Sequence, residues 1–270
     1  MTLSKQKTCS NTIAFAFLCL LAAIFLIPIL LVLLNSFKSR FYISSSPFAM
    51  PNSETFVGFE NYLNGLSSSG FFISFIRSVW VSIASVLVII VCTSMASWFI
   101  VRVKNKFTKA IYFLFAFSMI VPFQMVMYTM TFIVNRISFD NVFGIVFVYL
   151  GFGAGLSVFM FTGFVKAVPL EIEEAAEIDG CNPLQTFFLV VFPILKPTII
   201  TVSILNSMWV WNDYLLPYLI LGTDHKTVPV AIQIAMQGAY GATDYGGFMA
   251  MLVLAIIPIV IFYIASQKYI

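Results

Sequence analysis

Charged residues are scarce in this sequence of 270 amino acids. Lys, Arg, Asp and Glu make up 9% of it, whereas a soluble domain carries roughly 25%. Hydrophobic residues account for 61%, so most of the apolar surface must face lipid or other helices. This composition predicts a membrane protein. It excludes a disordered chain, a disulfide-stabilised scaffold and a nucleic-acid-binding domain.

Residues that build catalytic and metal centres are also scarce. The chain has one histidine, His225, and its four cysteines form no CxxC pair. Neither HExxH nor the phosphate-binding pattern GxxxxGK[ST] occurs. We therefore expect no metal site, no cofactor and no catalysis by this chain. Energy from ATP would have to come from a separate subunit.

Long apolar runs dominate the rest of the sequence. A spanning helix needs about 20 apolar residues to cross a hydrocarbon core of about 30 Å. The runs that meet this length are 13–34, 79–101, 111–133, 142–165, 198–221 and 248–266. They are too long and too continuously apolar for strands of a membrane barrel. We predict an all-α polytopic membrane protein with six transmembrane helices, in one domain over residues 1–270.

The basic residues indicate the orientation. Cytoplasmic segments of membrane proteins carry an excess of Lys and Arg. A tight basic cluster lies at 102–109, between the second and third predicted helices. Placing this cluster inside puts both termini in the cytoplasm, together with the segment 166–197.

The segment 166–197 reads as two short helices joined by a turn. Pro169 suits a first helical turn, and Gly180 suits the position just past a helix end. Asn182 and Pro183 then read as the N-cap and first residue of a second helix. Five acids fall within 171–179. A solvated amphipathic loop helix is the plain interpretation of such a stretch.

Small residues on the first of these helices favour a docking role instead. Ile172, Ala175, Ala176 and Asp179 share one face by their spacing. Small side chains let a helix backbone approach a partner closely. The face is therefore expected to form a small knob with an acidic rim.

The same segment resembles the EAA signature of ABC importer permeases. That signature reads E-A-A, three residues, G, nine residues and then I-x-L-P. Glu174, Ala175 and Ala176 match it, Gly180 has the right spacing and Pro193 closes the motif. The usual Ile and Leu are replaced here by Val190 and Phe192, which preserve apolar character.

The wider chain resembles the second permease subunit of carbohydrate-uptake importers of the maltose-transporter type. The similar stretches are IDGCNPLQTFFLVVFPILKP, WVWNDYLLPYLIL and YGATDYGGFMAM. The resemblance implies a permease in the bacterial cell membrane that works by alternating access. It also implies the following partners: a second homologous permease subunit, two cytoplasmic ATP-binding subunits, an extracellular solute-binding lipoprotein and a sugar. The residues that it assigns to ATPase coupling are Glu173, Glu174, Ala175, Ala176, Asp179, Gly180 and Pro193.

Polar and aromatic residues in two of the predicted helices are candidates for the solute pathway. A charge deep in a membrane costs roughly 2.5–3.5 kcal/mol on insertion scales, so Asp213 should face a partner helix or water. The candidates are Gln124, Tyr128, Asn206, Trp209, Asn212 and Asp213. For Asn206, Trp209, Asn212 and Asp213, a polar clamp between two permease subunits is the alternative explanation. For Gln124 and Tyr128, the alternative is ordinary interhelical hydrogen bonding. Pro122 precedes that pair and is expected to kink its helix.

The loop 222–247 is rich in glycine and tyrosine. By the same resemblance it faces the extracellular binding protein, with Tyr240, Gly241 and Tyr245 as candidate contacts. A packed outer cap is the alternative.

Other classes of function fit less well. An intramembrane enzyme would need convergent nucleophiles, bases or metal ligands, which this sequence does not offer. A channel or secondary transporter would not need an acidic double helix at the EAA spacing. Within ABC importers, a permease for another solute such as glycerol phosphate is the nearest alternative. A phosphate substrate would favour Arg or Lys inside the helices, and the central ones have none.

Overall fold

The computed structural model describes residues 2–236 and 243–269, which are helical almost throughout and contain no β-strand. These residues divide into two compact units. The first unit comprises Met1–Phe71 and Ile232–Ile257, and the second comprises Phe72–Ala231 and Pro258–Ile270. The expected all-α class is confirmed.

The first unit is built on the long apolar helix α1 (Thr2–Ser36), followed by α2 (Arg40–Ile43) and α3 (Glu60–Ser69). Asn61 of α3 holds the C-terminal end of α1 against α3. Its Nδ2 donates to the carbonyls of Ser36 and Lys38, both at 2.8 Å. Lys38 is buried and its Nζ donates to the Ser46 carbonyl at 2.9 Å. The predicted loop after the first helix is therefore an ordered cap.

The second unit contains most of the remaining helices. They are α4 (Phe71–Arg102), α5 (Lys106–Ser118), α6 (Phe123–Arg136), α7 (Gly144–Val165), α8 (Leu170–Ile178), α9 (Pro183–Gln185), the π-helix η1 (Thr186–Val191), α10 (Phe192–Ile194), α11 (Lys196–Asn212) and α12 (Leu215–Leu221). Three further helices close the list: α13 (Val228–Ala235) and α14 (Tyr245–Ser266), which each run across the boundary between the units, and the 3-10 helix η3 (Gln267–Tyr269).

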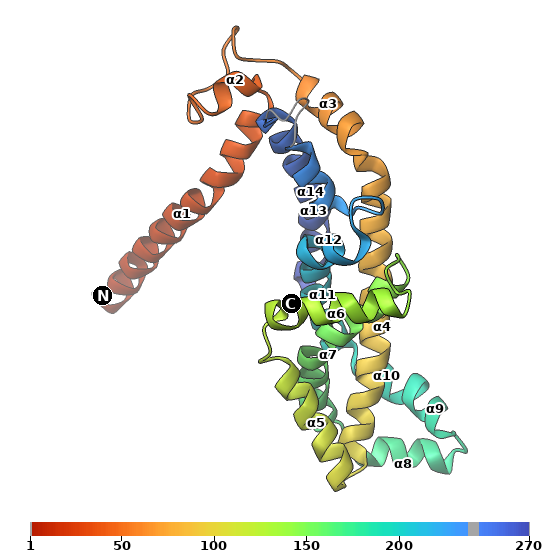
Figure 1. Ribbon diagram of the computed structural model, residues 1–270. Helices are drawn as coiled ribbons and strands as arrows, with labels where there is room; N and C mark the ends of the chain where they lie inside the picture. The colour runs from red at the N-terminus through yellow and green to blue at the C-terminus, as the bar shows by residue number, and fades with distance from the viewer. Residues whose placement is uncertain (1, 237–242, 270) are drawn as a thin grey trace. The chain divides into compact units, whose positions relative to one another are not determined.

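The core of the second unit lies where α4, α7, η1 and α11 meet. Ile89 of α4, Phe161 of α7, Phe187 of η1 and Val202 of α11 have no exposed surface. Because these residues come from helices far apart in sequence, their burial holds the segment 170–194 against the membrane helices. Figure 1 shows α8 beside the C-terminal end of α4.

Helix α4 runs for 32 residues without a glycine or a proline. Near its start, Arg77 Nη1 donates to the Asp224 carbonyl at 3.1 Å, and Ser78 Oγ accepts from the Val228 amide at 2.8 Å. Its last residue, Arg102, contacts α8. One unbroken helix therefore joins the segment before α13 to the segment after α7.

The number of membrane-crossing helices depends on how two bent pairs are counted. Four helices among the described residues are long and apolar enough to cross a membrane. There are up to six crossings if each bent pair is one span, the pairs being α5 with α6 and Pro183–Ile194 with α11. The predicted helix 111–133 is sharply bent: α5 and α6 meet at 108°, and the bend lies at Pro122, where the sequence predicts a kink. Pro122 is the N-cap of α6. It has no amide hydrogen to donate, and it disfavours helical geometry at the residue before it.

The expected helix 198–221 is also interrupted. Helix α11 ends at Asn212 and α12 begins at Leu215. Asp213 Oδ1 accepts from the amides of Leu215 and Leu216, at 3.1 and 3.4 Å. A side chain that caps a new helix start competes with continuation of the old helix. The loop expected at 222–247 likewise contains a helix, α13.

Candidate functional site

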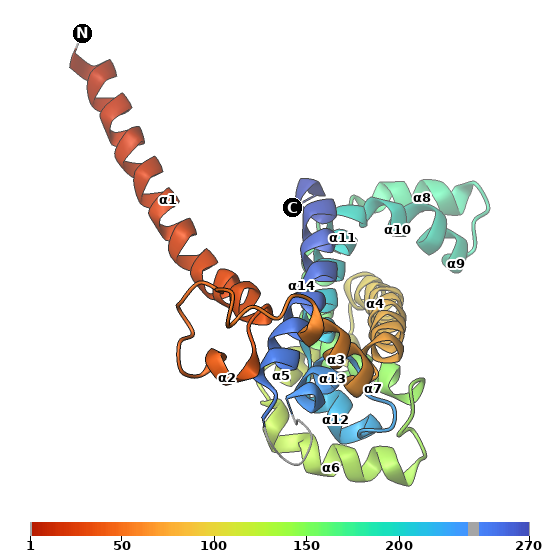
Figure 2. The ribbon, with the colours of Figure 1, turned by 90° about the horizontal axis from the view of Figure 1, so that it is seen from above.

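The segment 170–185 forms a helical hairpin, α8 and α9, joined at Gly180 (Figure 2). Gly180 has φ of +88°, a conformation that a side chain disfavours. Asn182 caps α9 reciprocally: its Oδ1 accepts from the Gln185 amide at 2.9 Å, and Gln185 Oε1 accepts from the Asn182 amide at 2.9 Å. The local structure therefore follows the sequence expectation, with Pro169 one position outside α8 as its N-cap.

Glu173 anchors the hairpin to helix α4. Its side chain accepts from Arg102 Nη2 at 2.6 Å, from Arg102 Nε at 3.0 and 3.1 Å, and from Trp98 Nε1 at 2.9 Å. Arg102 Nη2 also donates to the Val168 carbonyl at 3.0 Å. Glu173 is only 4% exposed. A fork-shaped guanidinium fixes the direction of a carboxylate as well as its position.

The aromatic ring of Trp98 extends the same joint. It packs on Phe187 of η1, with ring centroids 5.5 Å apart. Phe187 is completely buried. Trp98 therefore contacts both α8 and η1: its indole N–H donates to Glu173 of α8, and its ring packs on Phe187 of η1.

The outer side of the hairpin is apolar and acidic. Glu174, Ala175 and Asp179 are exposed, and Ile178 is 86% exposed. Ala176 instead turns inward beside Glu173. The four residues of the predicted face therefore differ in exposure: Ala176 is buried, whereas Ile172, Ala175 and Asp179 are exposed. Pro193, which closes the motif, lies exposed in α10.

Asp213 lies between α11 and α12 and contacts α7. Tyr149 donates its hydroxyl to Asp213 Oδ2 at 3.2 Å. The Tyr149 ring is completely buried and packs edge-on against Trp209, with centroids 5.3 Å apart. Asp213 thus faces a helix of its own chain, which gives the charge a polar partner away from lipid.

Trp209 thus meets Asp213 through Tyr149, whereas the remaining candidate pathway residues lie elsewhere. Asn206 is buried and its Nδ2 donates to Ser157 Oγ at 3.2 Å and to the Val202 carbonyl at 2.9 Å. Asn212 is exposed and donates to the Met208 carbonyl. Gln124 and Tyr128 lie exposed on α6. Interhelical packing accounts for Asn206.

The candidate contacts with a binding protein are only partly described. Tyr240 and Gly241 lie outside the described residues. Tyr245 is the first residue of α14 and is exposed.

Three contributors to the site were not predicted from the sequence: Arg102, Trp98 and Tyr149. In the sequence, Arg102 stands out only as a member of the basic cluster 102–109, which indicates the orientation of the chain in the membrane. Its position at the end of the second predicted helix, opposite a loop rich in acids, was the available signal. No sequence pattern marked Trp98 or Tyr149.

Comparison with known proteins identifies the family. Residues 89–270, more than half of the chain, match the family described as "Binding-protein-dependent transport system inner membrane component". The chain belongs to this family. The permease hairpin and its Arg102 anchor both lie inside the matched region.

Several curated proteins are similar to this permease over almost their whole length. It is 34% identical over 92% of its chain to the probable starch degradation products transport system permease protein AmyC of Thermoanaerobacterium thermosulfurigenes, covering 89% of that protein. It is 35% identical over 91% of its chain to the multiple sugar-binding transport system permease protein MsmG of Streptococcus mutans, covering 88%.

A solved structure has the same fold. All of this permease aligns with 98% of a chain from a bacterial ABC transporter involved in the import of the acidic polysaccharide alginate, at a TM-score of 0.78 and 20% identity. The family match and the permease relatives identify the long apolar helices as those of a multi-pass membrane permease.

Proposed function

We propose that this permease is one of two membrane subunits of an ATP-driven importer, and that it translocates a sugar or oligosaccharide delivered by an extracellular binding protein. In this proposal both termini and the α8–α9 hairpin lie in the cytoplasm. Two cytoplasmic ATP-binding subunits supply the energy. The chain itself catalyses no reaction and binds no nucleotide.

The hairpin carries this proposal. It exposes Glu174, Ala175 and Ile178 outward, while the buried Glu173 holds its other side to α4. A segment that is fixed on one side and exposes small, apolar and acidic groups on the other suits a close-packed joint with another protein. The sequence of this joint matches the EAA signature.

The residues that the EAA resemblance assigns to ATPase coupling take two roles within this joint. Glu174, Ala175, Asp179 and Gly180 form the side that contacts an ATP-binding subunit. Glu173 and Ala176, which are buried, hold that side on the permease, and Pro193 ends the motif as an exposed residue of α10.

The sugar assignment rests on the relatives. The names of AmyC and MsmG refer to starch degradation products and to multiple sugars. The permease covers nearly nine tenths of each protein, so the similarity includes the membrane helices as well as the hairpin. We extend the solute class to this chain on that ground.

Uptake by the reconstituted complex tests the proposal. The tagged permease is purified in mild detergent together with the subunits that accompany it, and is placed in vesicles with ATP inside the compartment that holds the hairpin. We expect ATP-dependent uptake of a labelled oligosaccharide. Uptake of glycerol phosphate but of no sugar would contradict the solute assignment, and uptake by this chain alone would contradict the mechanism.

The variant Glu174→Lys tests the contact side of the hairpin. A reversed charge at an exposed joint should abolish uptake while the protein remains inserted and folded. Glu177→Lys is the matched control, because Glu177 is also exposed on α8 but occupies one of the three variable positions of the motif. Equal uptake by the Glu174 variant and the wild type would remove the coupling assignment.

A further inference from the structure

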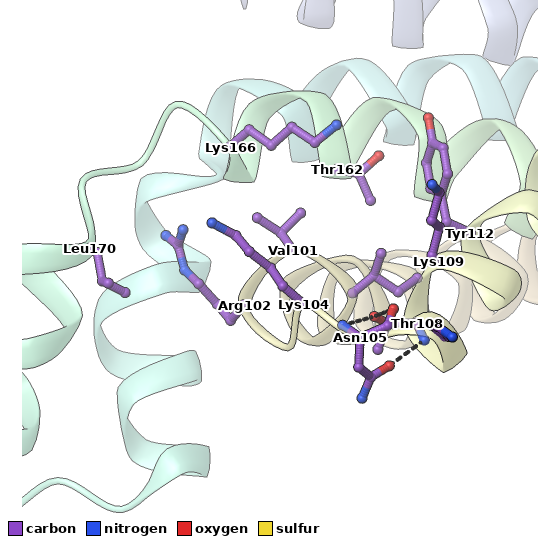
Figure 3. Close-up of a pocket in the computed structure, with 12 residues that line it drawn as sticks. Val101, Arg102, Lys104, Asn105, Thr108, Lys109, Tyr112, Thr162, Lys166 and Leu170 are labelled. Atoms are coloured by element: carbon purple, nitrogen blue, oxygen red, sulfur yellow. Dashed lines mark hydrogen bonds between the residues drawn. The ribbon is translucent and has the colours of Figure 1, made fainter.

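A large basic pocket lies beside the hairpin, at the ends of α4 and α7 and the start of α5 (Figure 3). Its volume is about 910 Å³. The basic side chains that line it are Arg102, Lys104, Lys106, Lys109 and Lys166, and no acidic side chain lines it. The proposed coupling and pathway roles use only Arg102 among them.

The lysines of this basic pocket form no ion pairs within the described part of the chain. Arg102 is neutralised by Glu173. Lys104, Lys106, Lys109 and Lys166 make no ion pair with an acidic side chain in the part of the chain that the structure describes. Like charges held around one space repel each other, and a bound anion removes that repulsion.

The geometry of the pocket is fixed by the backbone around it. Asn105 and Thr108 form a capping box at the start of α5, with the Thr108 amide donating to Asn105 Oδ1 at 2.8 Å. This cap sets the direction in which Lys106 and Lys109 leave the helix. On the opposite wall, the Lys166 ammonium lies 5.8 Å from the centre of the Tyr112 ring. Figure 3 shows Lys166 and Lys104 extending beside the same space.

Helix α5, whose first turns line the pocket, exposes apolar side chains farther along. Beyond Tyr112, helix α5 exposes Phe113, Leu114 and Phe117. In a membrane protein, such side chains contact acyl chains. A molecule with an anionic head and apolar tails would therefore place its head among the lysines and its tails along α5.

We propose that this pocket binds the phosphate headgroup of an anionic phospholipid such as phosphatidylglycerol. Basic pockets between helix ends recognise such headgroups, and each Lys or Arg near the surface strengthens the attraction. The bound lipid would lie against Arg102, the residue that holds the hairpin. The inference needs the membrane location of the chain, but it does not depend on the transported solute.

Lipid titration of the purified permease, with its accompanying subunits, tests the proposal. A fluorescent short-chain phosphatidylglycerol and the matching phosphatidylcholine are titrated separately in detergent. We expect phosphatidylglycerol to bind at least tenfold more tightly. The double variant Lys109→Gln and Lys166→Gln, which removes one charge from each wall, should weaken phosphatidylglycerol binding by roughly tenfold to thirtyfold.

Three controls separate the explanations. Lys196→Gln with Lys226→Gln removes the same charge outside the pocket and should leave binding unchanged, and Lys109→Arg with Lys166→Arg should preserve it. If the Gln double variant does not fold, the exposed single variant Lys109→Gln should still weaken binding several-fold.

Equal binding of the two lipids, or equal weakening in both Gln double variants, would overturn the proposal. Competition by millimolar inorganic phosphate as strong as that by the lipid would overturn it in favour of a free-phosphate site. Binding of the lipid only after the ATP-binding subunits are stripped from the complex would overturn it in favour of a protein contact.

Discussion

Glu173 is charged and buried within a segment that connects membrane helices. Its carboxylate accepts hydrogen bonds from both Arg102 and Trp98. Removing one partner of such a pair leaves the other charge poorly compensated, which costs more than the pair itself contributes.

We therefore expect Glu173→Gln to lower the free energy of unfolding by roughly 3 kcal/mol. Thermal unfolding in detergent measures the effect. Glu174→Gln is the matched control and should leave the unfolding temperature unchanged, because Glu174 is exposed. The pair would be energetically unimportant if both variants unfolded at the wild-type temperature.

The double variant Glu173→Gln with Arg102→Met provides a second prediction. Removing both partners together should cost less than the sum of the two single changes, because neither charge remains unpaired. A strictly additive result would mean that the two side chains do not interact in the folded protein.

Asp213 has a structural role within this chain. Asn at this position keeps an oxygen for the amides of Leu215 and Leu216, whereas Ala removes it. Asp213→Ala should therefore lower stability by about 1 kcal/mol through the lost cap, and Asp213→Asn should change it little.

Sugar uptake by the two Asp213 variants separates this role from a pathway role. We expect Asp213→Asn to retain uptake. Loss of uptake in a stable Asp213→Asn complex would show that the carboxylate itself serves the solute pathway.

Individual residues of the site were predictable where a short motif required them. Gly180 and Asn182 are required by backbone geometry, which the local sequence encodes. The Glu173–Arg102 pair joins residues 71 positions apart, and no local pattern encodes which helix end faces which acid. The inward turn of Ala176 follows from that pair, since it sets how α8 is rotated.

Among the elements, the α8–α9 hairpin depends on one backbone conformation. An added Cβ at Gly180 would meet no atom within 4 Å, so only the positive φ opposes a side chain there. Gly180→Ala should cost about 1–2 kcal/mol of hairpin stability. Gly180→Pro should cost more, because its amide donates to the Glu177 carbonyl and proline has no amide hydrogen.

Gly163 supplies the control for this prediction. It lies within α7 with open space around an added Cβ and without a positive φ. Gly163→Ala should therefore leave uptake intact and stabilise the helix by roughly 0.5–1 kcal/mol. The hairpin geometry would be irrelevant to coupling if Gly180→Pro transported as well as Gly163→Ala.

Helix existence was easier to predict than helix continuity. Apolar runs identify the segments that lie in a membrane, but they do not indicate where the backbone of a segment bends. Pro122 indicated a kink, yet the angle of 108° depends on packing of α6 against α12 that no local pattern contains. At Asp213, the cap competes with a helix whose apolar pattern continues unbroken.

At the scale of the whole molecule, the topology is open to direct measurement. With the native cysteines replaced, single cysteines are introduced at the exposed positions Lys104, Asp140 and Asp224. If α5 and α6 together form one crossing, Asp140→Cys and Asp224→Cys should react with an impermeant maleimide in intact cells. Lys104→Cys should react only after permeabilisation.

The same labelling identifies a different arrangement. Reaction of Asp140→Cys and Lys104→Cys from the same side would show that α5 and α6 form a re-entrant hairpin. The count of crossings would then fall, and the orientation of later helices would be reversed relative to the expectation from the basic residues.

Helix α4 has a mechanical consequence for the permease. Ser78 and Arg102 are separated along it by roughly 36 Å, and no glycine or proline between them offers a hinge. Arg102 is clamped to the hairpin at one end, and Ser78 is bonded to the start of α13 at the other. A tilt of the hairpin is therefore transmitted along α4 as along a rigid rod. It displaces the Val228 amide at the other end of this helix, because α4 contains no hinge that would absorb the motion.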